Sequence, residues 1–177
     1  MSEAISRFSL LRGDLKPKSS PVRPPWARPD ARLLSLCDSC GECLTACPEG
    51  IVRAGPGGIP ELDFSAGLCS LCGACAQACP TGALADVGQR PFPGVAQIAS
   101  SCLSIQGIAC RLCEEHCEPR AIRFRPALGG RALPEIEAEA CTGCGACAHV
   151  CPAQAVTFQE TSTQEIAAQE VTACPAA

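Results

Sequence analysis

The chain has 177 residues, 17 of them cysteine, and a formal net charge of −4. This cysteine content is typical of either a disulfide scaffold or a set of metal sites. The disulfide alternative needs an oxidising compartment and an export signal, but the apolar run at residues 8–11 is too short for a signal and is followed at once by Arg12. No stretch approaches the roughly 20 apolar residues of a membrane span. We therefore expect a cytoplasmic protein with metal-bound thiolates and no membrane span.

Charge is unevenly distributed along the chain, and large side chains are scarce. Residues 1–36 hold seven of the 14 basic residues against three acidic ones, whereas residues 37–177 hold seven arginines and 15 acidic residues. An acidic body argues against a nucleic-acid partner. The chain has five Phe, one Trp and no Tyr, so little core material is available and folding is expected to depend on bound metal.

The N-terminal segment is rich in proline and basic residues and shows no sustained apolar period. Residues 21–29, with the sequence PVRPPWARP, predict an extended and solvent-exposed backbone. Because the charge of this segment opposes that of the rest, it is either a docking element for an acidic partner surface, with Trp26 as an anchor, or a solvated tail.

Two similar stretches follow, each with a hairpin between cysteine clusters. Residues 51–54 and 61–64 bracket the turn sequence Gly-Pro-Gly-Gly, and residues 121–125 and 133–137 are their counterpart around a second Gly-Gly. A short helix is expected at 164–171. This organisation divides the chain into an N-terminal segment, a first module, a linker, a second module and a C-terminal tail: residues 1–36, 37–88, 89–101, 102–159 and 160–177.

Three cysteine runs share the pattern C-x2-C-x2-C-x3-C-P. They are Cys37, Cys40, Cys43 and Cys47; Cys69, Cys72, Cys75 and Cys79; and Cys141, Cys144, Cys147 and Cys151. This is the bacterial ferredoxin spacing, in which three thiolates of one loop bind a [4Fe–4S] cluster. The glycine after each second cysteine permits positive φ and close backbone approach. A zinc site would instead need two separated cysteine pairs. The runs predict an α+β protein of tandem 2[4Fe–4S] ferredoxin-like modules, with short helices and β-hairpins.

A fourth set of cysteines is irregular: Cys102, Cys110, Cys113 and Cys117. Seven residues separate its first two members where the regular runs have two, so the intervening loop must fold back, which Gly107 permits. The set indicates a fourth, more labile cluster; the alternative is a broken site with Cys102 as a buried free thiol. His116 could replace a missing ligand but is expected to face solvent, and Cys174 is expected to be a free thiol in the tail.

The last cysteine of each run is expected to serve a neighbouring cluster, as in two-cluster ferredoxins. The four expected ligand sets are Cys37, Cys40, Cys43 and Cys79; Cys69, Cys72, Cys75 and Cys47; Cys102, Cys110, Cys113 and Cys151; and Cys141, Cys144, Cys147 and Cys117.

An autonomous enzyme is not expected. Four thiolates close the coordination of each cluster, so no iron is open to substrate, and neither a G-x-G-x-x-G sequence nor a P-loop is present. The only histidines, His116 and His149, each lie beside a cluster cysteine. The chain is therefore expected to carry electrons or to support the assembly of a cluster on a partner.

Three features of the sequence point to one family. They are the irregular stretch 102–124, the leading Arg7-Phe8 with Leu11-Arg12-Gly13, and the sequence RPPWA at 23–27. On these the whole chain resembles the ferredoxin-type accessory protein of the periplasmic nitrate reductase system. The resemblance implies a cytoplasmic protein that binds the precursor of the molybdenum-containing catalytic subunit and supports assembly or redox loading of its iron–sulfur cluster before export.

A second interpretation is a general electron-transfer polyferredoxin of an oxidoreductase complex. The irregular run favours the maturation role, because its stretched loop should leave that cluster more exposed and labile, from which a pure electron carrier gains nothing obvious.

Overall fold

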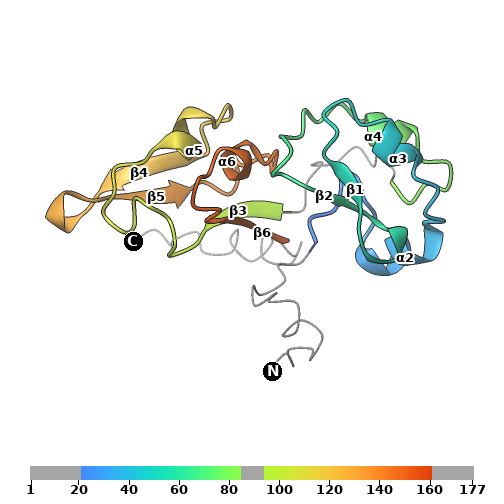
Figure 1. Ribbon diagram of the computed structural model, residues 1–177, viewed down its shortest axis with the longest axis horizontal. Coiled ribbons are helices and arrows are strands. Elements are labelled where there is room, and N and C mark those ends of the chain that lie inside the picture. Colours follow the sequence, from blue (N-terminus) through green and yellow to red (C-terminus); the bar gives the residue numbers. More distant parts are fainter. Residues whose placement is uncertain (1–20, 85–93, 161–177) are drawn as a thin grey trace, which may run out of the picture.

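The computed structural model describes residues 21–84 and 94–160, which form two halves lying side by side (Figure 1). The first half, residues 21–84, contains α2 (Asp30–Leu36), α3 (Glu42–Thr45), β1 (Val52–Ala54), β2 (Pro60–Leu62) and α4 (Ala74–Gln77). The second half, residues 94–160, contains β3 (Gly94–Ile98), α5 (Leu112–Glu115), β4 (Ile122–Pro126), β5 (Ala132–Ile136), α6 (Ala146–His149) and β6 (Val156–Glu160). Short helices and strands are thus mixed in both halves.

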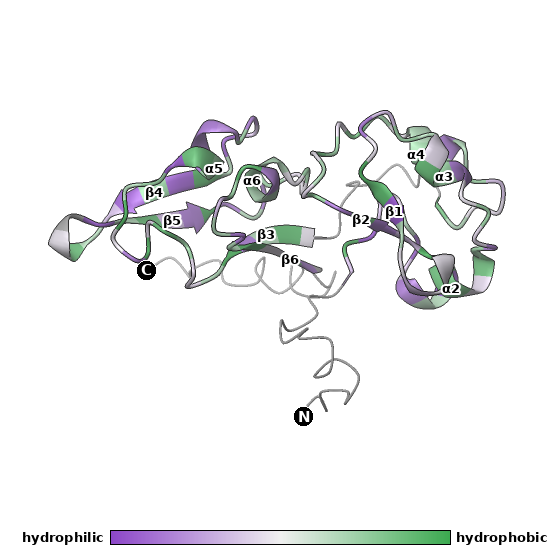
Figure 2. Ribbon diagram, viewed as in Figure 1, coloured by the Kyte–Doolittle hydropathy of each residue, from purple (hydrophilic) through white to green (hydrophobic). Residues whose placement is uncertain are grey.

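Both predicted hairpins are present. β1 pairs antiparallel with β2, with Val52 opposite Leu62, and β4 pairs antiparallel with β5, with Ile122 opposite Ile136. These pairs face the cores of their halves, and both hydrophilic and hydrophobic residues lie along β4 and β5 (Figure 2). Gly57 adopts a φ of +70° in the first connecting turn, a conformation that side chains disfavour.

The third sheet joins the two ends of the second half. β3 pairs antiparallel with β6, with Gly94 opposite Glu160 and Ile98 opposite Val156. Residues 94–98, predicted as part of a linker, are therefore a strand of the second half. The strand is short and its partner lies far along the sequence, so no local pattern identified the pairing.

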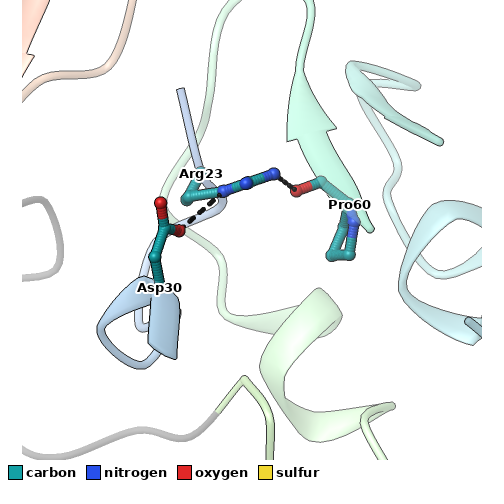
Figure 3. Close-up of polar contacts among 3 residues, drawn as sticks. All are labelled: Arg23, Asp30 and Pro60. Atoms are coloured by element: carbon teal, nitrogen blue, oxygen red, sulfur yellow. Dashed lines mark hydrogen bonds and ion pairs between the residues drawn. The ribbon is translucent and has the colours of Figure 1, made fainter. Parts of the chain in front are cut away.

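The prediction that residues 21–29 are solvent-exposed is wrong. Pro24 and Pro25 are fully buried against the first half. Arg23 donates from Nε to the carboxylate of Asp30 at 3.0 Å and from Nη1 to the carbonyl oxygen of Pro60 at 3.3 Å (Figure 3). Because a proline has no N–H to satisfy, its ring can be buried without leaving a donor unpaired.

The same segment continues into α2, although the sequence of residues 1–36 shows no sustained apolar period. Leu33 is fully buried, while the next residue, Leu34, is 57% exposed. Ala27 forms an isolated antiparallel bridge with Leu84, and Arg28 donates from Nε to the carbonyl oxygen of Gly82 at 2.8 Å. Residues 21–36 are therefore an integral layer of the first half.

Several sequence predictions lie outside the described residues. They concern residues 1–20, with Arg7 and Phe8, and residues 161–177, with the helix at 164–171 and Cys174. Within residues 21–84 and 94–160, no helix is long and apolar enough to cross a bilayer.

Candidate metal centres

Each cysteine run forms a loop followed by a four-residue helix. Helices α3, α4, α5 and α6 carry the third cysteine of their runs: Cys43, Cys75, Cys113 and Cys147. In the regular runs the helix is preceded by Gly41, Gly73 or Gly145, with φ of +80°, +76° and +82°. The predicted left-handed glycines are thus confirmed. A side chain in that conformation would cost roughly 1–2 kcal/mol.

A second left-handed residue precedes the second cysteine of each regular run. Ser39, Leu71 and Gly143 have φ of +60°, +56° and +72°. Left-handed residues close together turn successive backbone N–H groups toward one side of the chain, and such concave nests bind phosphates and iron–sulfur clusters. The regular loops therefore have the backbone form expected of an anionic ligand site.

The irregular run forms its loop without a left-handed residue directly before its helix. Arg111, at the position of the helix-capping glycines, has a φ of −135°. The loop 102–110 instead turns back at Gly107, whose φ is +90°, as predicted. Ser104, only 4% exposed, fixes the loop by donating its hydroxyl hydrogen bond to the carbonyl oxygen of Ala132 in β5.

All four runs share a turn after the last cysteine. The residue three positions later is left-handed in each: Gly50, Gly82, Arg120 and Gln154, with φ of +60°, +67°, +54° and +47°. In three runs a backbone N–H then donates to the sulfur: Leu84 to Cys79 Sγ at 3.4 Å, Ala121 to Cys117 Sγ at 3.2 Å, and Ala155 to Cys151 Sγ at 3.3 Å. Such bonds favour the thiolate over the thiol. At Cys79, burial raises the pKa, but the hydrogen bonds from Leu84 and Thr81 outweigh it and the net pKa is lowered.

One cavity brings cysteines of the first two runs together. It is lined by the last cysteine of one run and the first three of the other, Cys47, Cys69, Cys72 and Cys75. Pro25, Trp26 and Ile51 contribute its wall, and a Cβ added to Gly73 would lie 3.8 Å from the Trp26 ring. Burial, and then the nearby Cys47 thiol, raise the pKa of Cys69 to about 11.

The second half contains a second cavity with an equivalent set of four cysteines. It is lined by three cysteines of the irregular set and the last cysteine of the following run, Cys102, Cys110, Cys113 and Cys151. Leu103, Phe124 and Val156 contribute its wall. Burial, and then the nearby Cys102 thiol, raise the pKa of Cys113 to about 11.

The remaining cysteines form two further groups. Burial raises the pKa of Cys43, and the neighbouring thiols of Cys79, Cys37 and Cys40 raise it further. Burial raises the pKa of Cys147 to about 12, with Cys141, Cys144, Cys113 and Cys117 as the neighbouring thiols. These neighbours include the last cysteine of the other run in each half.

The spacing of these thiols differs from that of a zinc site. Among the described residues, no three Cys, His, Asp or Glu side chains converge closely enough to hold one metal ion. Zinc needs its ligands at about 2.0–2.3 Å from a single centre. A [4Fe–4S] cluster takes one thiolate on each iron, so its four sulfurs stand farther apart.

The irregular set is not the most exposed one. Its four cysteines are all partly buried, whereas Cys40 and Cys72 of the regular runs are exposed. The expectation of a more exposed irregular site is therefore wrong, because Ser104 and the walls of the cavity hold the long loop in place. His116 is exposed, as predicted, with Nδ1 3.0 Å from the carbonyl oxygen of Leu112.

Sequence reasoning missed two aromatic walls. Trp26 was assigned to a partner surface or to solvent, and it lies at the first cavity instead. Phe124 lines the second cavity, with the Arg111 guanidinium 5.2 Å from its ring centroid. The alternation of apolar Ile122 and Phe124 with arginines along β4 could have indicated the Phe124 wall.

Comparisons with known proteins agree with this chemistry. The family model described as the 4Fe-4S dicluster domain matches residues 36–83 and 108–162. The chain is 40% identical to the ferredoxin-type protein NapF of Escherichia coli strain K12 over 154 residues, or 87% of this chain and 94% of that protein. It is 39% identical to the ferredoxin-type protein NapF of Haemophilus influenzae over 161 residues, or 91% and 92% of the two chains. It is 34% identical to the methylamine utilization ferredoxin-type protein MauM of Paracoccus denitrificans over 170 residues, or 83% and 74%.

Proposed function

Because the chain belongs to the family of the ferredoxin-type protein NapF and contains the 4Fe-4S dicluster domain, we propose that it holds four [4Fe–4S] clusters with crossed ligand sets. The first site is Cys37, Cys40, Cys43 and Cys79; the second is Cys69, Cys72, Cys75 and Cys47; the third is Cys102, Cys110, Cys113 and Cys151; and the fourth is Cys141, Cys144, Cys147 and Cys117. The first two sites belong to one ferredoxin-like module and the last two to another.

The observation that carries this proposal is the pair of matched cavities. Each is lined by three cysteines of one run and the last cysteine of another. Their walls are largely apolar, which limits access of water, and backbone N–H groups donate to the sulfurs of Cys117 and Cys151. When bound, the clusters supply one-electron transfer. The chain's own residues hold them, exclude water and tune their potentials by hydrogen bonding.

The partner that fits this family is the precursor of a molybdenum-containing periplasmic nitrate reductase. In this proposal the protein acts in the cytoplasm, binds the catalytic-subunit precursor before export, and supports assembly or redox loading of its iron–sulfur cluster. Support comes from the extent of the similarity to NapF, which covers most of both chains and includes the irregular stretch.

The second candidate is a general electron-transfer polyferredoxin. One observation favours it: the irregular site is enclosed as well as the second site is, and its cysteines are only partly exposed. A labile cluster for donation is therefore not evident, while the exposed Cys40 and Cys72 place cluster edges near solvent, where a redox partner can approach.

A co-purification experiment separates the two candidates. The holo-protein is mixed anaerobically with the reductase precursor, and the iron content of the precursor is compared with that of precursor produced without this protein. Maturation predicts a complex and an iron deficit in the absence of the protein. Full iron loading of the reductase without the protein would exclude the maturation role and leave electron transfer.

A further inference from the structure

The two halves meet at two of the cysteine loops. The backbone N–H of Cys69 donates to the carbonyl oxygen of Cys144 at 2.8 Å. Cys69 belongs to the second site and Cys144 to the fourth site, so this bond joins loops of different halves. The Cys144 thiol is also one of the neighbours that raise the pKa of Cys69, after burial and the Cys47 and Cys72 thiols.

An aromatic side chain packs at this contact between the halves, which we call the crossing. Phe64, from the first half, lies so near Gly145 that a Cβ added there would be 2.1 Å from the ring. Phe64 is 8% exposed, and its ring centroid lies 4.9 Å from that of Phe158 in β6. Nδ1 of His149 lies 3.3 Å from the carbonyl oxygen of Phe64. The residue after Cys144 is therefore packed against the first half without space for a side chain.

Within each half the two sites are also adjacent. α3 packs on α4, and α5 packs on α6. The Cys43 thiol is among the neighbours of Cys75, and the Cys113 thiol is among the neighbours of Cys147. The first site thus adjoins the second, the second adjoins the fourth across the crossing, and the fourth adjoins the third.

We propose that the contact of Cys69 and Phe64 with the Cys144–Gly145 loop joins the four cluster sites into one continuous electron path through both halves. The inference rests on the proposed function, because it needs the four clusters. With clusters bound, Cys69 and its set would hold the one-electron donor of the second site and Cys144 and its set the one-electron acceptor of the fourth site. One electron would pass between them at the crossing, oxidising the first and reducing the second, with no bond made or broken. A one-electron protein donor at the exposed Cys40 and Cys72 supplies that electron, and the irregular third site is the far end of the path.

Two glycines provide a matched pair of variants. Gly145 and Gly41 occupy the same position in their runs, with φ of +82° and +80°. Alanine is strained to the same degree at both. An added Cβ at Gly41 has nothing within 4 Å, whereas at Gly145 it collides with Phe64. Gly145→Ala therefore displaces the crossing, and Gly41→Ala controls for backbone strain in a cluster loop.

Two measurements on the anaerobic holo-protein test the path. Hydrogen exchange at the amide of Cys69 reports the bond to Cys144, and EPR of the dithionite-reduced protein reports magnetic interaction between clusters of the two halves. Gly145→Ala should lose amide protection at Cys69 and should lose the part of the interaction broadening that extends across the halves. Gly41→Ala should keep both.

Three results would overturn the path. They are an unchanged EPR spectrum in Gly145→Ala after Cys69 protection is lost, equal losses in both variants, and a wild-type spectrum that already shows two separate pairs of clusters. If Gly145→Ala does not accumulate, Phe64→Ala opens the same contact without backbone strain and is expected to give the same two losses. A wild-type protein with fewer than four clusters by iron analysis would overturn the proposed site set itself, while a full complement without coupling overturns the path alone.

Discussion

Crossed ligation makes a sharp prediction for the last cysteine of a run. Cys151 follows Cys147 in sequence, but it lines the cavity of Cys102, Cys110 and Cys113. Its replacement by alanine should therefore empty the irregular site and leave the site of its own run filled. Alanine is the appropriate replacement because a serine oxygen can still bind iron.

The magnitude follows from cluster stoichiometry. Four [4Fe–4S] clusters contain about 16 iron atoms, and loss of one leaves about 12. Cys151→Ala and Cys113→Ala should each leave about 12, and the double variant should also leave about 12, because crossed ligation assigns both residues to one cluster. Cys151→Ala combined with Cys147→Ala should leave about 8, because those residues serve different clusters. Departures from additivity thus report which cysteines share a site.

The assay is anaerobic counting of iron and acid-labile sulfide per chain, with EPR of the reduced protein as an independent count. The opposite pattern would refute the reasoning: if the pair Cys147 and Cys151 lost no more iron than either single variant, each run would hold its own cluster. Comparing two double variants that share Cys151→Ala also cancels any general loss of stability, since both proteins carry the same first lesion.

Three further predictions concern the loops and the N-terminal layer. Ser104→Ala removes a buried hydrogen bond to a carbonyl of β5, which should cost about 1–3 kcal/mol locally and speed chelator-driven loss of one cluster. Leu33→Ala should lower the free energy of unfolding of the holo-protein by about 2–5 kcal/mol in a denaturant titration, because the side chain is fully buried. Deletion of residues 1–20 should weaken precursor binding in a pull-down and leave cluster absorbance intact, because it removes four basic residues and keeps the buried Pro24, Pro25 and Leu33.

Each of these has its own control. Ser35 donates a similar bond to a backbone carbonyl at 2.9 Å on an exposed surface, so Ser35→Ala should not change the rate of cluster loss; equal rates in the two serine variants would contradict the anchoring of the loop. Leu34→Ala should stay within about 0.5 kcal/mol of wild type, and equal effects at both leucines would contradict the packing of α2. Unchanged binding after the deletion would show that residues 1–20 do not dock on the partner.

Much of the site could be predicted because its determinants are local. Spacing between cysteines sets the loop, glycine permits the left-handed turn, and Gly-Gly sequences mark the hairpins, all within a few residues. The folding back of the irregular loop at Gly107 was accessible for the same reason.

The features that escaped prediction depend on partners far along the chain. The sequence around Pro24 and Pro25 is typical of solvated polyproline, but both residues are buried, and the adjacent Arg23 donates to the carbonyl oxygen of Pro60 in β2. The pairing of β3 with β6 depends on two strands at opposite ends of the second half. The positive φ of Gly145 already accounts for a glycine at this position, so nothing further in the sequence indicated its contact with Phe64.

The position of Trp26 gives the protein a built-in optical probe. It is the only tryptophan in the chain, and it stands at the wall of the second site. An iron–sulfur cluster absorbs broadly across the visible and near-ultraviolet, so energy transfer from the indole should quench its fluorescence when cluster sites near Trp26 are filled. Emission at a single wavelength would then follow the filling and emptying of these sites in the unmodified protein.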